Sequence, residues 1–258
     1  MDVSEIVSAF RQRADDLVIA NDDEFEFAPA DVFAWLSEAE REACLRAGLI
    51  YDDETAKICT IQLVDGVDRY KLDPRIVEVQ DVWIDRSAQF PGYHRARLRN
   101  TDQTNIGYRR FPGPLSGDGR PCRNGDYGQE FFQDPRNILH VRAYSVDGQK
   151  LRVYGKPDTT YAANPNFSYL NLEVYRLPLE PITGENDDLE IPAIHHDGLV
   201  DWLLFRAFGG KDGEELDDQR SNRAYQIFEA RFGERPSASQ VRQAAEGRAD
   251  CTLGYGGY

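Results

Sequence analysis

Basic residues, cysteines and long apolar runs are all scarce in this 258-residue chain. Its 30 lysines and arginines stand against 45 acidic residues, and the net charge of −15 argues against a free-standing nucleic-acid binder. The four cysteines form no CxxC pair, so we expect free thiols in a reducing compartment. No stretch approaches the roughly 18 apolar residues of a membrane span, and the N-terminus lacks a signal-peptide pattern. We therefore expect no membrane segment and synthesis in a cytoplasm.

Signatures of catalysis and cofactor binding are missing as well. The sequence holds no P-loop, GxGxxG, HExxH, GxSxG or EF-hand pattern, so we expect neither a cofactor nor an enzyme. One candidate metal cluster remains, formed by His195, His196, Asp197 and Asp201. Adjacent histidines on a helix point about 100° apart and cannot grip one metal together, and only the two aspartates have i,i+4 spacing. A metal-dependent hydrolase is therefore kept only as an alternative.

The hydrophobic period changes twice along the chain. Apolar residues recur every three or four positions up to about residue 49 and again from 188, which predicts helices. Between about 56 and 177 they alternate, which predicts strands. We predict an α+β fold in which residues 1–55 and 188–250 form a helical bundle. Residues 56–187 are expected to form an inserted antiparallel β-sandwich or barrel.

Local signals refine this layout. Asp31 is expected to cap the second helix and Gly48 to end it. The run DGVD (residues 65–68) predicts a hairpin between the first two strands, and VDGQ (146–149) predicts a later turn.

A long loop rich in Gly, Pro, Asn and Asp is predicted over residues 95–137. Between residues 95 and 123 it holds seven arginines and two aspartates, a local charge of +5 in an acidic chain. The loop is either an ordinary solvated segment or a contact surface. The candidate contact residues are Arg95, Arg97, Arg99, Arg109 and Arg110.

The segment IPAIHHDGLVDWLLFRAF (191–208) is apolar on most sides from Ile194 onward, which predicts an enclosed helix. Its two histidines are expected to be polar edge residues of the first turn. Four apolar residues of this helix and the next are predicted to serve helix packing or a subunit interface: Trp202, Leu203, Phe205 and Phe228.

The C-terminal run CTLGYGGY contains too much glycine to fold alone. It is either a disordered end or an extended segment that docks on a partner, with Tyr255 and Tyr258 as anchors. The candidate docking residues are Cys251, Thr252, Leu253, Gly254, Tyr255, Gly256, Gly257 and Tyr258.

Five segments in order resemble the head-to-tail connector, or portal adaptor, family of tailed bacteriophages. They are DVFAWLSEAEREACLRAG, DRYKLDPRIVEVQDVWID, LNLEVYRLPLEPI, LEIPAIHHDGLVDWLLFRAF and AYQIFEARFG, within residues 25–85 and 165–232. The resemblance implies a ring of twelve copies beneath the portal that continues the DNA channel toward the tail. It implies a C-terminal tail that reaches the portal protein, and contacts with tail or nozzle proteins. The expected location is the virion neck, after assembly in the host cytoplasm.

The resemblance also gives the charge a role, because an acidic lumen lets genomic DNA slide without sequence-specific binding. A tail-side neck protein, such as a tail tubular or head-completion component, remains an alternative within the same class. A third class is a carbohydrate-binding module, whose exposed aromatic residues would be Tyr93, Tyr108, Tyr127, Phe131 and Phe132.

Overall fold

The computed structural model describes residues 1–16, 26–85, 95–100, 143–154, 169–209 and 215–237. The chain divides into two compact units. The helical unit comprises Met1–Asp52, Arg75–Glu78 and Tyr175–Ser237. The β unit comprises Asp53–Pro74, Val79–Val174 and Ala238–Tyr258. The mixture of helices with mainly antiparallel sheets confirms the predicted α+β class.

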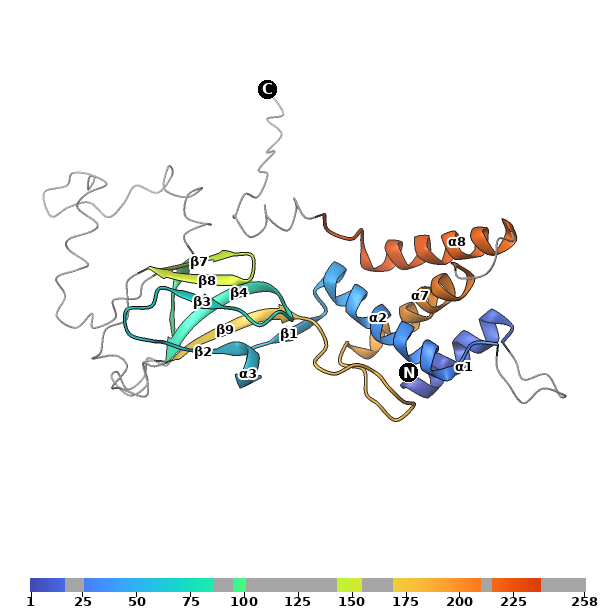
Figure 1. Ribbon diagram of the computed structural model, residues 1–258, viewed down its shortest axis with the longest axis horizontal. Coiled ribbons are helices and arrows are strands. Elements are labelled where there is room, and N and C mark those ends of the chain that lie inside the picture. Colours follow the sequence, from blue (N-terminus) through green and yellow to red (C-terminus); the bar gives the residue numbers. More distant parts are fainter. Residues whose placement is uncertain (17–25, 86–94, 101–142, 155–168, 210–214, 238–258) are drawn as a thin grey trace, which may run out of the picture. The chain divides into compact units, whose positions relative to one another are not determined.

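Four α-helices and one short 3-10 helix build the described part of the helical unit (Figure 1). They are α1 Val3–Ala14, α2 Pro29–Ala47, η2 Ala193–His195, α7 His196–Gly209 and α8 Glu215–Phe232. Helix α1 begins with a capping box, in which the Asp2 side chain accepts from the Glu5 backbone N–H and the Glu5 side chain accepts from that of Asp2. These bonds satisfy backbone donors that the first turn of a helix leaves free.

Helix α2 begins earlier than the sequence predicted. Pro29 occupies the first helical position, where its missing N–H costs nothing, and Asp31 lies in the first turn instead of capping the helix. The end at Gly48 is confirmed, since this glycine adopts φ 58° and its N–H bonds to the Cys44 carbonyl. Cys44 and Cys59 are buried free thiols, as expected, and burial raises the pKa of Cys44 to about 12.

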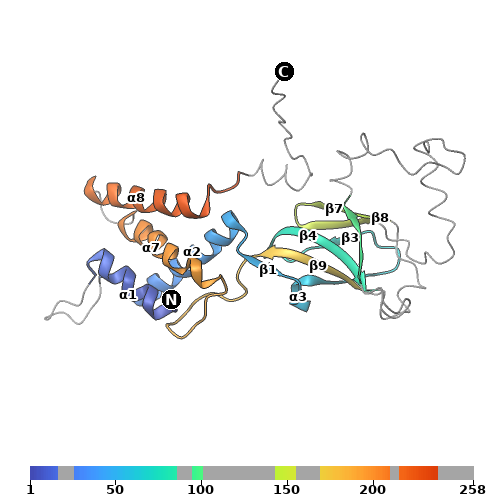
Figure 2. The same cartoon turned by 180° about the vertical axis from the view of Figure 1, so that it is seen from behind.

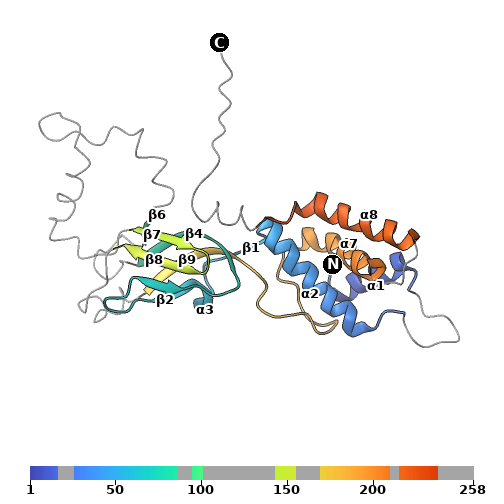
Figure 3. The same cartoon turned by 45° about the horizontal axis from the view of Figure 1, so that its top comes forward.

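Helix α7 is the centre of the helical unit. Figures 1, 2 and 3 show it between α8 on one side and α1 and α2 on the other. Leu199, Val200 and Leu203 have no exposed surface and join the apolar faces of α1, α2 and α8 in one core. The prediction of an enclosed helix is confirmed for α7, but Ile194 lies in η2 and is 83% exposed.

Two sheets are described. One has the strand order β1-β9-β4-β5, with β2 also paired to β9, and the other has the order β3-β8-β7-β6. A short helix, α3 Ala56–Cys59, precedes β2. The strands are β1 Ile50–Asp52, β2 Thr60–Gln62, β3 Arg69–Lys71, β4 Ile76–Asp85, β5 Arg95–Arg97, β6 Arg99–Asn100, β7 Ala143–Asp147, β8 Lys150–Tyr154 and β9 Tyr169–Arg176.

Strand pairing corrects one of the two predicted turns. Strands β2 and β3 flank DGVD but do not pair, because β2 pairs with β9 and β3 pairs with β8. The hydroxyl of Tyr70 instead holds the connection by donating to the Val67 carbonyl (2.9 Å) and accepting from the Val64 N–H (3.1 Å). The turn at VDGQ is confirmed, since β7 and β8 form a hairpin in which Gly148 adopts φ 57°.

The inserted region differs from the prediction in three further respects. The sheets form no closed barrel among the described strands. Strands β6 and β7 are parallel, whereas β2 with β9, β3 with β8, β4 with β5 and β7 with β8 pair in antiparallel fashion. The predicted loop begins with strands, because Arg95–Arg97 form β5 and Arg99–Asn100 form β6.

Within the described residues, no helix is long and apolar enough to cross a membrane.

Candidate functional site

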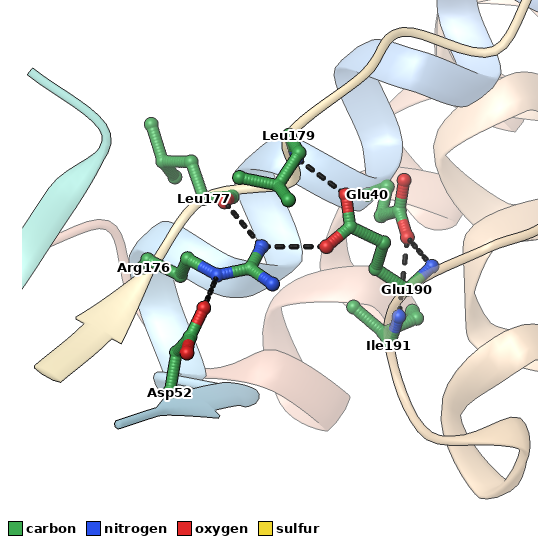
Figure 4. Close-up of polar contacts among 7 residues, drawn as sticks. All are labelled: Glu40, Asp52, Arg176, Leu177, Leu179, Glu190 and Ile191. Atoms are coloured by element: carbon green, nitrogen blue, oxygen red, sulfur yellow. Dashed lines mark hydrogen bonds and ion pairs between the residues drawn. The ribbon is translucent and has the colours of Figure 1, made fainter. Parts of the chain in front are cut away.

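A buried ion-pair network joins strand ends to the helices of the helical unit (Figure 4). Arg176, the last residue of β9, donates from Nε to Asp52 at the end of β1 (2.5 Å). Its Nη1 donates to Glu190 (2.5 Å) and to the Leu177 carbonyl (3.1 Å). Burial lowers the pKa of Arg176, but the hydrogen bonds to Glu190 and Asp52 outweigh it and the net pKa is raised. The guanidinium therefore stays charged.

Two further carboxylate contacts fasten the chain that follows β9. Glu190 also accepts from the backbone N–H of Leu179. Its carboxylate therefore links the two ends of the segment 179–190. Glu40 of α2 accepts from the N–H groups of Glu190 (2.7 Å) and Ile191 (3.2 Å) through a single oxygen. Figure 4 shows these contacts as one continuous chain from β1 to α2. The network positions this segment against α2 rather than presenting a reactive group to solvent.

Glu40 should make folding sensitive to pH. Burial is the largest cause that raises its pKa above the ordinary value, so the folded state binds this proton more readily than the unfolded state. Stability linked to Glu40 is therefore full below its ordinary pKa and is lost as pH rises through the raised folded pKa. Glu40→Gln keeps an oxygen acceptor for the two N–H groups and removes the buried charge. We expect its free energy of unfolding to rise relative to that of the original chain as pH increases from 4 to 8.

Urea denaturation at several pH values measures this difference. Glu38→Gln, at a more exposed position of the same helix, is the matched control for removing one carboxylate. The free energy of unfolding of Glu40→Gln minus that of the original chain should rise with pH. A difference that stays constant or falls as pH rises would contradict a raised pKa of Glu40 in the folded protein.

The structure separates the four residues of the candidate metal cluster. His196 is buried, contrary to the expected edge position, and its ring nitrogens face the carbonyl oxygens of Met1 and Ile191 (2.9 Å for the latter). His195 lies in η2, half-buried, with its ring 6.0 Å from that of Phe232.

The two aspartates of that cluster contact arginines. Asp197 pairs with Arg13 of α1 and Arg231 of α8, each at 3.2 Å, and Arg13 also lies 3.9 Å from Asp201. The hydrogen bond from Arg231 lowers the pKa of Asp197, whereas burial raises that of Asp201. These contacts connect α1, α7 and α8. Among the residues that the structure describes, no three His, Cys, Asp or Glu side chains gather where they could hold a metal ion.

The predicted packing residues meet at the junction of α7 and α8. Trp202 and Phe228 have ring centroids 4.8 Å apart, and Trp202 lies 5.1 Å from Phe205. Leu203 and Phe228 have no exposed surface, so both pack within the chain. A contact with a neighbouring subunit stays a prediction. Phe205 is the most exposed of the four, and Trp202 keeps 6% of its surface exposed.

Arg46, near the end of α2, is a packing residue that the sequence did not single out. Its guanidinium lies 5.7 Å from the ring of Trp202, 5.3 Å from Tyr225 and 5.2 Å from Phe228. It also donates to the Tyr225 hydroxyl (3.3 Å) and the Gly233 carbonyl (3.1 Å). A cation over aromatic faces is attracted electrostatically, so this side chain fastens α2 to α7 and α8.

The remaining candidate residues fall largely outside the described residues. Arg109, Arg110 and the docking residues 251–258 lie there, as do the five aromatic residues of the carbohydrate-binding alternative. Arg95, Arg97 and Arg99 lie on β5 and β6, where the structure gives their backbone. The network around Arg176 was missed because no local pattern marks it: Asp52 precedes Arg176 by 124 positions, and Glu190 follows it by 14.

The ionic groups inside the helical unit contact one another and the backbone, as buried polar groups in folded proteins generally do. The sequence matches the model of the SU10 adaptor protein family over residues 1–250, and the chain belongs to this family of phage structural adaptors. The predicted resemblance to phage adaptor proteins is thereby confirmed. No curated protein matches the sequence.

Proposed function

We propose that this protein is a head-to-tail adaptor, or connector, in the neck of a tailed phage. In this role twelve copies form a ring beneath the portal, extend the DNA channel and attach the tail, and the protein has no catalytic activity. The observation that carries the proposal is the family match across residues 1–250. The net charge of −15 supports it, because an acidic channel wall repels phosphate and lets DNA pass without sticking.

The proposal assigns a task to each part of the chain. Residues 1–55 and 188–250 act as a helical bundle that forms the ring, and 56–187 act as an inserted β domain. The arginines of the segment 95–137 contact tail or nozzle proteins. The C-terminal segment 251–258 docks on the portal protein, where its glycines allow close backbone approach and its tyrosines provide apolar anchors.

Affinity capture from virus-producing cells tests the proposal. The tag is placed at the N-terminus to leave the C-terminal segment free, and the captured material is analysed by mass spectrometry and negative-stain microscopy. Portal and tail proteins together with ring-shaped particles are the expected result. Capture of tail proteins without portal would favour the tail-side neck protein instead. A lone protein without virion partners would contradict both.

Removal of residues 251–258 should separate folding from docking. We expect the shortened chain to keep the circular dichroism spectrum and thermal midpoint of the full chain, and to lose capture of the portal protein. A matched control replaces Tyr255 and Tyr258 by Phe, which keeps the apolar rings and should keep binding. Unchanged portal capture by the shortened chain would refute the assigned role of this segment.

A further inference from the structure

The outer face of α8 carries no acidic side chain over more than two helical turns. From Gln219 to Phe228 the helix contains two arginines and no aspartate or glutamate, in a chain with 45 acidic residues. Arg223 has no ion-pair partner among the described residues, and Arg220 lies over the ring of Phe208 at 5.4 Å. The exposed residues of this face are Gln219, Arg220, Asn222, Arg223, Gln226 and Ile227.

A second surface of the helical unit has the opposite charge. The acidic segment, residues 177–194, contains five acidic residues and no lysine or arginine. Two of the five have internal tasks, since Asp187 accepts from the backbone of Thr183 and Gly184, and Glu190 pairs with Arg176. The other three are exposed and have no ion-pair partner in the described part of the chain: Glu180, Glu185 and Asp188.

The acidic segment is held in place before any partner arrives. Ser37 of α2 donates to the carbonyl of Ile182 (3.1 Å) and accepts from its N–H (2.8 Å). Glu40 and Arg176 fasten the end of the segment through Glu190, as described above. The exposed carboxylates therefore sit on an ordered surface, and little conformational entropy is lost when they bind.

The two surfaces lie on opposite sides of the helical unit, α8 above and the acidic segment below in Figures 1 and 2. The α8 face also exposes one large apolar side chain, Ile227. A contact between two different surfaces of one subunit joins identical subunits head to tail, and it builds a ring when the rotation between neighbours closes and a filament when it does not. Apolar contacts within a rim of charged groups are typical of such interfaces.

We propose that the outer face of α8 binds the acidic segment of a second copy of this chain. Arg220 and Arg223 of one subunit then face Glu180, Glu185 and Asp188 of the next, and Ile227 supplies apolar contact. This inference rests on the proposed function, because the contact would join neighbouring subunits of the ring. The inference names the two surfaces that meet, whereas the family match names neither.

Charge reversal on each face tests the contact in the full-length chain. One variant carries Arg220→Glu and Arg223→Glu, and the other carries Glu185→Arg and Asp188→Arg. We expect each variant alone to self-associate at least about tenfold more weakly than the original chain, since like charges then face one another. A mixture of the two should associate again, because each contact in an alternating assembly joins opposite charges. Arg41→Glu, at another exposed arginine without an ion-pair partner among the described residues, is the control and should leave association unchanged.

Sedimentation velocity over a range of concentrations measures association, and circular dichroism checks that each variant is folded. Added salt should weaken the association of the original chain. An original chain that stays monomeric throughout, or a mixture no larger than the separate variants, overturns the inference. Capture of portal and tail proteins by the original chain is scored independently, so the proposed function survives or fails on its own result.

Discussion

Arg176→Met is expected to lower the free energy of unfolding by about 3–5 kcal/mol, the cost of removing one partner from a buried ion pair. Methionine fills part of the space of the arginine side chain but brings no charge. Asp52 and Glu190 would then lose the guanidinium that offsets the cost of keeping them away from water. The Leu177 carbonyl would lose a donor as well.

Two controls separate this effect from a general effect of losing an arginine. Arg206 pairs with Glu38 at 3.4 Å in a half-exposed setting, so Arg206→Met should cost no more than about 1 kcal/mol. Adding Glu190→Gln to Arg176→Met should recover part of the loss, because one of the two uncompensated charges disappears and an amide oxygen remains for the Leu179 N–H, while Asp52 stays unpaired with the guanidinium. Urea denaturation followed by tryptophan fluorescence reports the change. Equal losses at Arg176 and Arg206 would show that the network contributes no more than a surface pair.

The sequence identified the elements whose signals are local. Helices α7 and α8 follow from apolar residues at helical spacing, and the end of α2 follows from Gly48, which adopts φ 58°. The hairpin at VDGQ is equally local, because a two-residue turn fixes the pairing of its own strands.

The sequence was misleading where a partner distant in the chain decides the outcome. DGVD has a typical hairpin composition, yet β2 pairs with Leu170 and its neighbours more than a hundred positions away. Strand pairing depends on packing against non-local neighbours, which composition alone does not reveal. His196 was likewise predicted to be an edge residue, but its ring is buried and contacts the carbonyl oxygens of Met1 and Ile191, and the sequence does not reveal that Met1 lies there.

The arrangement of charge links the fold to the proposed assembly. Arg176, Glu190 and Glu40 use buried charge to hold one segment rigid, and the exposed acidic residues of that segment have no ion-pair partner in the described part of the chain. A subunit that must assemble in one direction benefits from two rigid and different surfaces, since flexible ones lose entropy on contact. In the proposed assembly the role of the buried network is indirect, because it holds the acidic segment in place.

Gly198→Ala should destabilise the protein, because the added methyl group has no room between α7 and α8. Gly198 lies in the first part of the helix, where α8 passes closely. An added Cβ would meet Cδ of Arg231 at 2.5 Å and two ring atoms of Phe232 at 2.9 Å, closer than real contacts of this kind. Alanine is otherwise favoured over glycine in helices by about 1 kcal/mol, so any loss must come from packing. We expect a net decrease of about 1–3 kcal/mol in the free energy of unfolding, the usual cost of overpacking.

Gly184→Ala is the matched control, because a Cβ there meets no atom within 4 Å and the residue keeps the N–H that donates to Asp187. It should change stability by no more than about 0.5 kcal/mol. The displacement should also reach Asp197, whose partner Arg231 is the side chain pushed aside, so Gly198→Ala should weaken the pairing between them. Measuring Asp197→Asn in both backgrounds tests this link: the cost of that substitution should be smaller when residue 198 is alanine. If Gly198→Ala were as stable as the original chain, α7 and α8 would not approach as closely as described, and the glycine within HHDGLVDW would need another explanation.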